Sequence, residues 1–396
     1  MADAYDFWAA RISSEKTAAI DDFWLRFTDV HRRIERHFQG YSPQVNPDAE
    51  MANALGGLAT DLACDFEVSE LGQITLVVTA ELRHTRRALA RAAVWRAPEL
   101  RGWRFSDVRA PVSAADAALK AIRLRSRSDG LAVSSIEPRR GAHRMIDLEV
   151  RGAGERDFLA DQAGIVFATL LGEDIDQDWL GEVGAEPQSV MTLARGLFSK
   201  KADDPAPWLR DFHDEAMAVI AATRDELPDR PYGAHRMRVD DTTNFRLRPT
   251  EGDRSRRRDA LQYQSRDPKL VSARLGGARV AGQRFSRFAE IPCGLKIRTG
   301  TSRLTEAAEI ASLGVVLEEA LMAARIGGLT GRASGLEHAY IDLALTDIDR
   351  GAEVLRRTLA AQDITTPTWL IFDEAGLEDC YHPLMPQTQP TPMDEH

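Results

Sequence analysis

Residues 339–374 have the sequence AYIDLALTDIDRGAEVLRRTLAAQDITTPTWLIFDE. Apolar and polar residues alternate over 340–345, as expected of a β-strand with one buried face. Asp347 occupies the N-cap position of a following helix, where a carboxylate can accept from free backbone N–H groups. The apolar face of that helix is formed by Ile348, Leu355 and Leu359. Pro367 excludes further helix, and residues 368–372 are aromatic and β-branched, so the stretch predicts a strand–helix–strand unit packed on a sheet.

The residues before this stretch extend the unit. Residues 294–299 have the composition of a strand, and a long helix follows that ends near Gly327. Its apolar face consists of Ile310, Leu313, Leu317, Leu321 and Ala324. A short strand then leads into the strand of 340–345. The order over 294–374 is therefore β-α-β-β-α-β, which predicts a ferredoxin-like unit.

The first half of the chain predicts a mixture of helices and short strands. Helices are expected over 17–38, 82–95 and 155–171, and a hairpin over 64–80. Two further strands are expected near 131–136 and 145–150. We predict an α+β fold here with a mostly antiparallel sheet.

At 396 residues the chain is longer than one hydrophobic core usually supports, so we expect two α+β domains. The first is predicted over 1–198 and the second over 208–382. Residues 199–207, charged and proline-bearing, are the expected linker. The proline-rich residues 383–396 are expected to be a disordered tail.

The composition favours a cytoplasmic protein. Three cysteines, Cys64, Cys293 and Cys380, lie far apart and follow no metal-binding or disulfide spacing. The N-terminus lacks the basic and apolar regions of a signal peptide, and no apolar run is long enough to span a bilayer. We therefore expect reduced thiols and a cytoplasmic location, without a cofactor.

The net charge of −10 hides two basic segments. Residues 83–140 contain 14 Lys and Arg against 5 Asp and Glu, and residues 231–300 contain 16 against 7. Since charges are screened beyond roughly 8 Å at physiological salt, such segments can act locally in an acidic protein.

Arginines within the basic segments are the main candidates for a binding site. Arg236 and Arg238, Arg246 and Arg248, and Arg123 and Arg125 each flank one residue, so each pair is expected on the outer face of a strand. The candidate binding residues are Arg236, Arg238, Arg246, Arg248, Arg256, Arg257, Arg258, Arg332 and His338. They could instead form a solvated sheet face paired with acidic groups.

Two other motifs are weaker. The alternating carboxylates of 174–178 begin like a calcium loop, but Trp179 and Ala185 occupy the positions that need glycine and glutamate. We expect a solvated acidic turn and no metal site. The glycine-rich residues 327–335 follow a helix instead of preceding one, which favours a helix cap and hairpin over a phosphate loop. Arg332, Ser334 and His338 remain pocket candidates there.

Several motifs in the first half resemble a family of uncharacterised bacterial hypothetical proteins. They are Phe23-Trp24-x-x-Phe27, the strand of 74–80, Ala97-Pro-Glu-Leu-x-Gly-Trp103 and Leu171-Gly-Glu173, and they cover about residues 20–185. The resemblance implies a fold and a bacterial origin but no site. The C-terminal unit is similar in layout to the regulator of ribonuclease activity B family, a ferredoxin-like inhibitor fold.

The sequence favours a binding protein over an enzyme. None of the nucleophile, zinc-protease or Ser-x-x-Lys motifs occurs in a suitable setting. The leading hypothesis is a regulatory or immunity-type protein that binds a macromolecule, a protein more readily than a nucleic acid. The alternatives are a hydrolase-like enzyme with a site between domains and a nucleic-acid-binding protein that uses its arginine faces.

Overall fold

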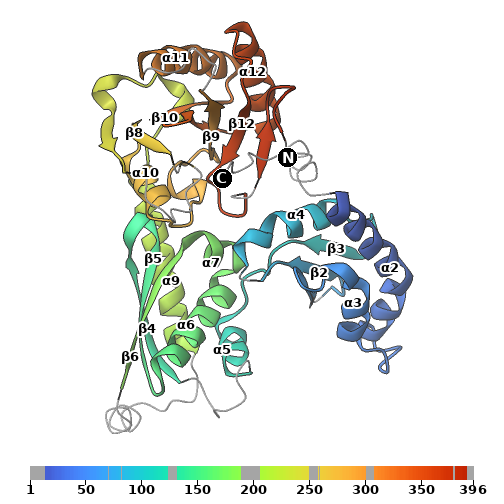
Figure 1. The fold of residues 1–396 in the computed structure, drawn as a ribbon. Coiled ribbons are helices and arrows are strands. Elements are labelled where there is room, and N and C mark those ends of the chain that lie inside the picture. The colour runs from blue at the N-terminus through green and yellow to red at the C-terminus, as the bar shows by residue number, and fades with distance from the viewer. Residues whose placement is uncertain are drawn as a thin grey trace. The chain divides into compact units, whose positions relative to one another are not determined.

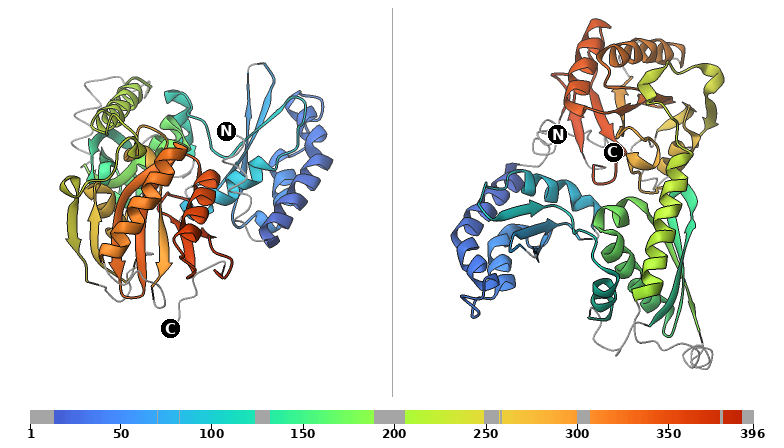
Figure 2. Two further views of the ribbon diagram at one scale, coloured as in Figure 1. Left: turned by 90° about the horizontal axis from the view of Figure 1, so that it is seen from above. Right: turned by 180° about the vertical axis from the view of Figure 1, so that it is seen from behind.

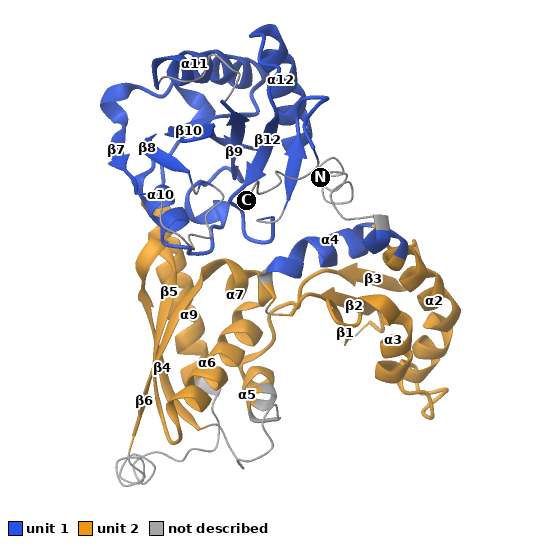
Figure 3. Cartoon of the chain, viewed as in Figure 1, with its two compact units in different colours: residues 1–18, 85–95, 227–396 blue, residues 19–84, 96–226 orange. Residues whose placement is uncertain are grey.

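The computed structural model describes residues 14–69, 71–81, 83–123, 132–188, 206–248, 257, 259–299, 307–377 and 380–389. The chain divides into two compact units (Figure 3). Unit 1 comprises residues 1–18, 85–95 and 227–396, and unit 2 comprises residues 19–84 and 96–226. The division differs from the predicted domains, whose proposed linker lies outside the described residues except for 206–207, the start of a helix.

Unit 2 contains most of α2 together with seven further α-helices or 3-10 turns and six strands among its described residues. Its helical elements are α2 (Ser14–Phe38), α3 (Pro47–Leu55), η1 (Gly56–Leu58), α5 (Ala114–Arg123), η3 (Ala142–Arg144), α6 (Arg156–Leu171), α7 (Glu173–Trp179) and α9 (Ala206–Asp225). Its strands are β1 (Ala63–Val68), β2 (Ile74–Thr79), β3 (Trp103–Ser106), β4 (Val133–Arg140), β5 (Ile146–Gly152) and β6 (Leu180–Pro187). A short turn, η2 (His84–Arg86), spans the boundary between the units.

These strands form two separate sheets of three, in the orders β1-β2-β3 and β4-β5-β6. Each sheet has one antiparallel and one parallel pair, β2 with β3 and β5 with β6 being parallel. The prediction of one mostly antiparallel sheet is therefore wrong. Parallel pairing requires a crossover connection, and helices supply it in both cases.

A separate hydrophobic core supports each sheet of unit 2. Trp24 and Phe27 of α2 pack edge-on against Trp103 and Phe105 of β3, and Phe23 packs against Trp24 and Phe27 within the helix. The second core joins α5, α6 and α9 to β4 and β5. Arg123 ends helix α5, so the prediction of a strand at Arg123 and Arg125 is wrong for Arg123, and Arg125 lies outside the described residues.

Unit 1 contains one large sheet. Its helical elements are α4 (Arg87–Trp95), η4 (Tyr232–Ala234), η5 (Val239–Asp241), α10 (Pro268–Leu275), η6 (Gly282–Arg284), α11 (Ala307–Ala324) and α12 (Ile348–Ala361). Its strands are β7 (Thr243–Arg246), β8 (Ala260–Ser265), β9 (Ile291–Arg298), β10 (Gly327–Gly335), β11 (His338–Leu345), β12 (Thr368–Phe372) and β13 (Tyr381–Pro383).

The strand order in this sheet is β13-β12-β9-β11-β10-β8-β7, and all six neighbouring pairs are antiparallel. The predicted helices and strands of the C-terminal stretch are confirmed, and Asp347 accepts from the N–H of Arg350 at 3.0 Å as the predicted N-cap. The chain is thus a mixed α+β protein. The glycine-rich residues 327–335 are themselves strand β10 instead of a loop.

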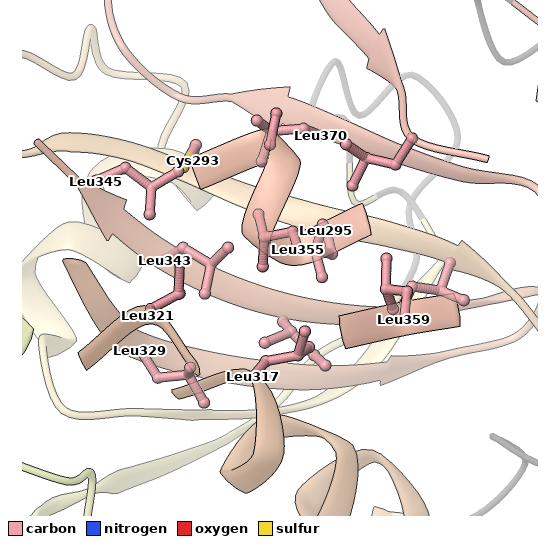
Figure 4. Close-up of a cluster of buried hydrophobic side chains, with 14 of the residues drawn as sticks. Cys293, Leu295, Leu317, Leu321, Leu329, Leu343, Leu345, Leu355, Leu359 and Leu370 are labelled. Carbon is pink, nitrogen blue, oxygen red and sulfur yellow. The ribbon is translucent and has the colours of Figure 1, made fainter. Parts of the chain in front are cut away.

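Helices α11 and α12 cover one face of the sheet (Figures 1 and 2). Leu317 and Leu321 of α11 and Leu355 of α12 pack against Leu295 of β9 and Leu343 of β11 (Figure 4). All five side chains are fully buried. Since residues alternate between faces along a strand, the neighbours of Leu343 on β11 face the opposite side, which α10 covers.

Residues 383–389, predicted to be disordered, pack onto the sheet instead. Leu384 and Met385 are buried in the core beneath α11 and α12. The N–H of Leu384 donates to the carbonyl of Thr368, and the indole of Trp369 donates to the carbonyl of Gln389. The prediction of disorder is wrong here because Leu384 and Met385, the two apolar residues between Pro383 and Pro386, are buried in the core. Within the described part of the chain, we find no helix whose length and hydropathy suit a bilayer span.

Candidate functional site

Four of the candidate arginines are exposed. Arg236, Arg238, Arg246 and Arg248 all face solvent, and Arg236 forms a surface ion pair with Glu319 at 2.6 Å. Arg246 ends strand β7, but the strand predicted at 236–239 is absent. That segment is held instead by the N–H of Met237, which donates to both carboxylate oxygens of Glu318 at 2.9 and 3.1 Å. Arg256 and Arg258 lie outside the described residues.

A hollow of about 300 Å³ lies at the β7 end of the seven-stranded sheet. We call it the polar hollow, and its lining residues are Asn244, Phe245, Arg246, Gln262, Tyr263, Gln264, Ala307, Ile310, Arg332, Ala333 and Ser334. They come from β7, β8 and β10 and from the first turns of α11. Two predicted candidates, Arg246 and Arg332, are thereby brought together.

Strand register explains why the polar lining groups share one face. Gln264 of β8 pairs with Asn244 of β7 on one side and with Arg332 of β10 on the other. Gln262 pairs in the same way with Arg246 and Ser334. Directly paired residues point to the same face, so these six side chains form two polar rows across three strands.

That face is the one covered by α11 and α12 farther along the sheet, because Arg332 pairs with Ile341 of the core beneath them. The polar hollow therefore begins where the apolar core ends, at Ile310 of α11. His338, by contrast, shares the parity of Tyr340 and Asp342 on β11 and belongs to the opposite face. Its predicted place in a common pocket with Arg332 is wrong.

Arg332 is the most unusual group in the polar hollow. It is half-buried, and its Nε donates to the amide oxygen of Gln264 at 2.6 Å. Burial lowers the pKa of Arg332, against the weaker opposing effect of Glu318. No carboxylate of the described residues lies within ion-pair distance of it. A guanidinium that has lost part of its hydration and meets a neutral amide retains a strong affinity for an anion.

The polar hollow as a whole presents donors. Its described lining offers two guanidinium groups, three side-chain amides and one serine hydroxyl, without a carboxylate or histidine. Gln264 is fixed by a second hydrogen bond, from its Nε2 to the hydroxyl of Thr242 at 2.8 Å. Ile310 adds apolar contact area, whereas the ring of Phe245 packs on the opposite, α10-covered face of the sheet. Such a set can bind a carboxylate or phosphate but holds no pair of groups arranged to exchange a proton.

Arg257, predicted to be an exposed binding residue, is instead part of a buried ion cluster. The cluster consists of Arg257, Arg274, Asp342 and Asp373, whose side chains are between 0 and 7% exposed. Arg257 donates to Asp342 at 2.6 Å and to Asp373 at 2.7 Å, and Arg274 lies 2.7 Å from each carboxylate. Each charge thus meets both opposite charges, and the set is neutral.

The buried ion cluster lies on the α10-covered face, and burial dominates its electrostatics. Burial raises the pKa of Asp342 to about 6, although Arg257 lowers it and Asp373 raises it further. Burial lowers the pKa of Arg274 to about 10. Gly294 makes room for the cluster, because a Cβ there would lie 2.6 Å from the Arg257 Nη2 and 2.9 Å from the Asp342 Oδ1. The charges of the cluster are mutually satisfied, so the loss of any one of them would leave a buried charge uncompensated.

His338 contributes to a second polar group on the same face. Oδ2 of Asp259 accepts from the N–H groups of Glu337 and His338 at 2.8 and 2.9 Å, and Oδ1 accepts from the hydroxyl of Tyr340. Burial alone raises the pKa of Asp259, but the hydrogen bonds from His338, Tyr340 and Glu337 outweigh it and hold the pKa below its usual range.

This arrangement predicts an acid-sensitive contribution to stability. Because the folded pKa of Asp259 is lowered, its contribution is present above the unfolded value of about 3.9 and is lost as the pH falls further. We expect Asp259→Asn to reduce the free energy of unfolding by about 1–3 kcal/mol at neutral pH. The difference from the wild type should shrink toward about pH 2 in denaturant titrations, and a difference independent of pH would refute the assignment.

The acidic stretch of 174–178 is not a solvated turn. It lies within helix α7, and Asp176 and Asp178 are buried. Among the residues that the structure describes, no group of three or more His, Cys, Asp or Glu is arranged to hold a metal ion.

No motif in the sequence singles out the three amide side chains of the polar hollow, Asn244, Gln262 and Gln264. The one local signal is Leu261-Gln-Tyr-Gln-Ser265, which alternates as a strand with a polar face should. The pairing of that face with Arg332 joins segments about 70 residues apart, and Arg332 to Gln264 alone spans 68.

No protein-family model matches this chain, and neither the curated proteins nor the solved structures include a match.

Proposed function

We propose that the protein acts by binding an anionic partner through the polar hollow and the exposed arginines beside it, without chemistry of its own. The observation that carries the proposal is Arg332, a half-buried guanidinium that a neutral amide holds in place at 2.6 Å. A carboxylate of the partner would accept hydrogen bonds from the remaining N–H groups of this guanidinium. A regulatory or immunity-type role in a bacterial cytoplasm fits this behaviour and is part of the proposal.

The partner proposed is a protein in preference to a nucleic acid. Single-stranded nucleic acid is bound by arginines interleaved with aromatic rings on which bases stack. Tyr263 and Phe285 are buried, which leaves Phe245 half-buried and Phe288 partly exposed. Acidic side chains need only the guanidinium and amide donors that the polar hollow presents.

We also propose that the unit over 294–374 is ferredoxin-like. Its support is the chain order β9-α11-β10-β11-α12-β12 together with the spatial order β12-β9-β11-β10. The polar hollow then belongs to an addition to that unit, since β7 and β8 extend it at the β10 edge.

The test is the affinity for an acidic peptide. We take as probe a fluorescein-labelled peptide of about eight alternating Glu and Thr residues, measured by fluorescence anisotropy. Arg332→Gln should weaken binding by about tenfold, because a charge-assisted hydrogen bond contributes roughly 1.5–3 kcal/mol. Raising the salt concentration should weaken the wild type as well, since part of the site is exposed.

The control removes the same charge elsewhere in unit 1. Arg357 of α12 is 70% exposed and pairs at the surface with Glu353, so Arg357→Gln should leave the affinity within about twofold. Equal affinities of the two variants would refute the proposal. Tighter binding of a single-stranded oligonucleotide than of the peptide would favour the nucleic-acid alternative.

A further inference from the structure

Strand β7 is the last strand of the sheet among the described residues. It pairs with β8 on one side, from Thr243 opposite Ser265 to Arg246 opposite Gln262, and with no described strand on the other. An edge strand presents a row of unpaired backbone N–H and C=O groups that can pair with another chain.

The register identifies which groups point outward. The N–H of Leu247 donates to the carbonyl of Leu261, which continues the β7–β8 pairing. In an antiparallel pair, alternate residues direct both backbone groups to the same neighbour. The backbone N–H and C=O groups of Thr243, Phe245 and Leu247 therefore point toward β8. Those of Asn244 and Arg246 point away from the sheet.

These same two residues carry side chains that line the polar hollow. A residue of an added antiparallel strand that pairs with Asn244 or Arg246 would share their face. Its side chain would stand beside the guanidinium of Arg246, with Arg332 two strands farther in. Arg248, exposed just beyond β7, prolongs the positive edge. Charge complementarity thus favours acidic residues at alternate positions of the added strand.

A second copy of this chain is the poorer occupant. Pairing β7 with another β7 would bring the arginines of two positive edges together, and like charges on facing strands are destabilising. An acidic segment has no such cost.

We propose that β7 accepts an extended, acidic segment of a partner protein as an additional strand, its acidic side chains directed to Arg246 and the polar hollow. This inference rests on the proposed function and specifies how the anionic partner binds. The ladder bonds supply affinity irrespective of sequence, and the arginines select the acidic residues.

The experiment removes a backbone N–H and keeps every arginine. Asn244→Pro deletes the outward donor at an edge position where proline is tolerated, and Asn244→Ala truncates the same side chain but keeps the N–H. Both variants lose the Asn244 amide, so with the Glu-Thr peptide Asn244→Pro should bind about tenfold more weakly than Asn244→Ala. Equal affinities of the two variants would overturn strand addition.

A second arm uses the unmodified protein, so it holds even if Asn244→Pro does not fold. In the proposed register, the Glu residues that face the polar hollow also carry the N–H groups that bond to β7. N-methylation of the Glu amides should weaken binding about tenfold, and N-methylation of the Thr amides should leave it within about twofold. Equal effects of the two modifications would overturn the inference.

The two proposals fail separately. If Arg332→Gln weakens peptide binding but the proline and N-methyl changes do not, the polar hollow binds acidic groups and strand addition is wrong. If Arg332→Gln binds as tightly as Arg357→Gln, the proposed function itself is wrong. If a peptide with Gln in place of Glu binds as tightly as the Glu-Thr peptide, the proposal that the partner is acidic is also wrong.

Discussion

Arg257→Met is expected to reduce the free energy of unfolding by about 3–5 kcal/mol. The substitution leaves Asp342 and Asp373 with Arg274 as the remaining cation of the buried ion cluster. Two carboxylates removed from water then share one guanidinium, and the uncompensated charge must be neutralised or exposed. Methionine fills much of the arginine volume, so the loss measures charge more than packing.

Chemical denaturation at neutral pH is the measurement. Arg248→Met removes an exposed arginine nine positions away and should change the free energy of unfolding by no more than about 0.5 kcal/mol. Arg257→Lys keeps the charge but loses the planar fork that contacts two carboxylates, so an intermediate loss is expected. A loss below about 1 kcal/mol for Arg257→Met would show that Asp342 and Asp373 do not need both cations in the folded protein.

Leu355→Ala is expected to reduce the free energy of unfolding by about 2–5 kcal/mol. Leu355 is fully buried on the face of α12 that packs on the sheet (Figure 4). Removal of its side chain forfeits the transfer free energy and leaves a cavity among leucines held by two helices and the strands beneath, where collapse is restricted.

The matched control is Leu336→Ala in the turn between β10 and β11, because Leu336 is 67% exposed. It should change the free energy of unfolding by no more than about 0.5 kcal/mol. Similar losses at the two positions would contradict the assignment of this face as the core.

The periodic elements of the C-terminal unit could be predicted from sequence. Strand β11 alternates, α12 has a capped apolar stripe, and Pro367 separates that helix from β12, so local pattern and tertiary packing agree. Helix α2 could be predicted equally well, because its aromatic stripe recurs along its length. Helix α7 could not be predicted, since buried carboxylates replace an apolar stripe in its sequence.

The candidate site could be predicted only in part from the sequence. Arg246 and Arg248 are exposed as alternation predicts, although only Arg246 lies within strand β7. Alternation could not distinguish Arg257 from the arginines around it. Arg257 is buried because it contacts Asp342 and Asp373, 85 and 116 residues away in the chain. The polar hollow likewise depends on strand order, which no local pattern encodes.

In the proposed complex Arg332 contacts the anionic groups of the partner, and its own side chain reports on this contact directly. In a sample labelled with ¹⁵N-arginine, the Nε–Hε resonance of Arg332 is assigned by its absence in Arg332→Gln and followed as the Glu-Thr peptide is added. We predict that it shifts and saturates at the affinity measured by anisotropy, while the resonance of Arg357 stays in place. Saturation of peptide binding without a change at Arg332 would contradict the account.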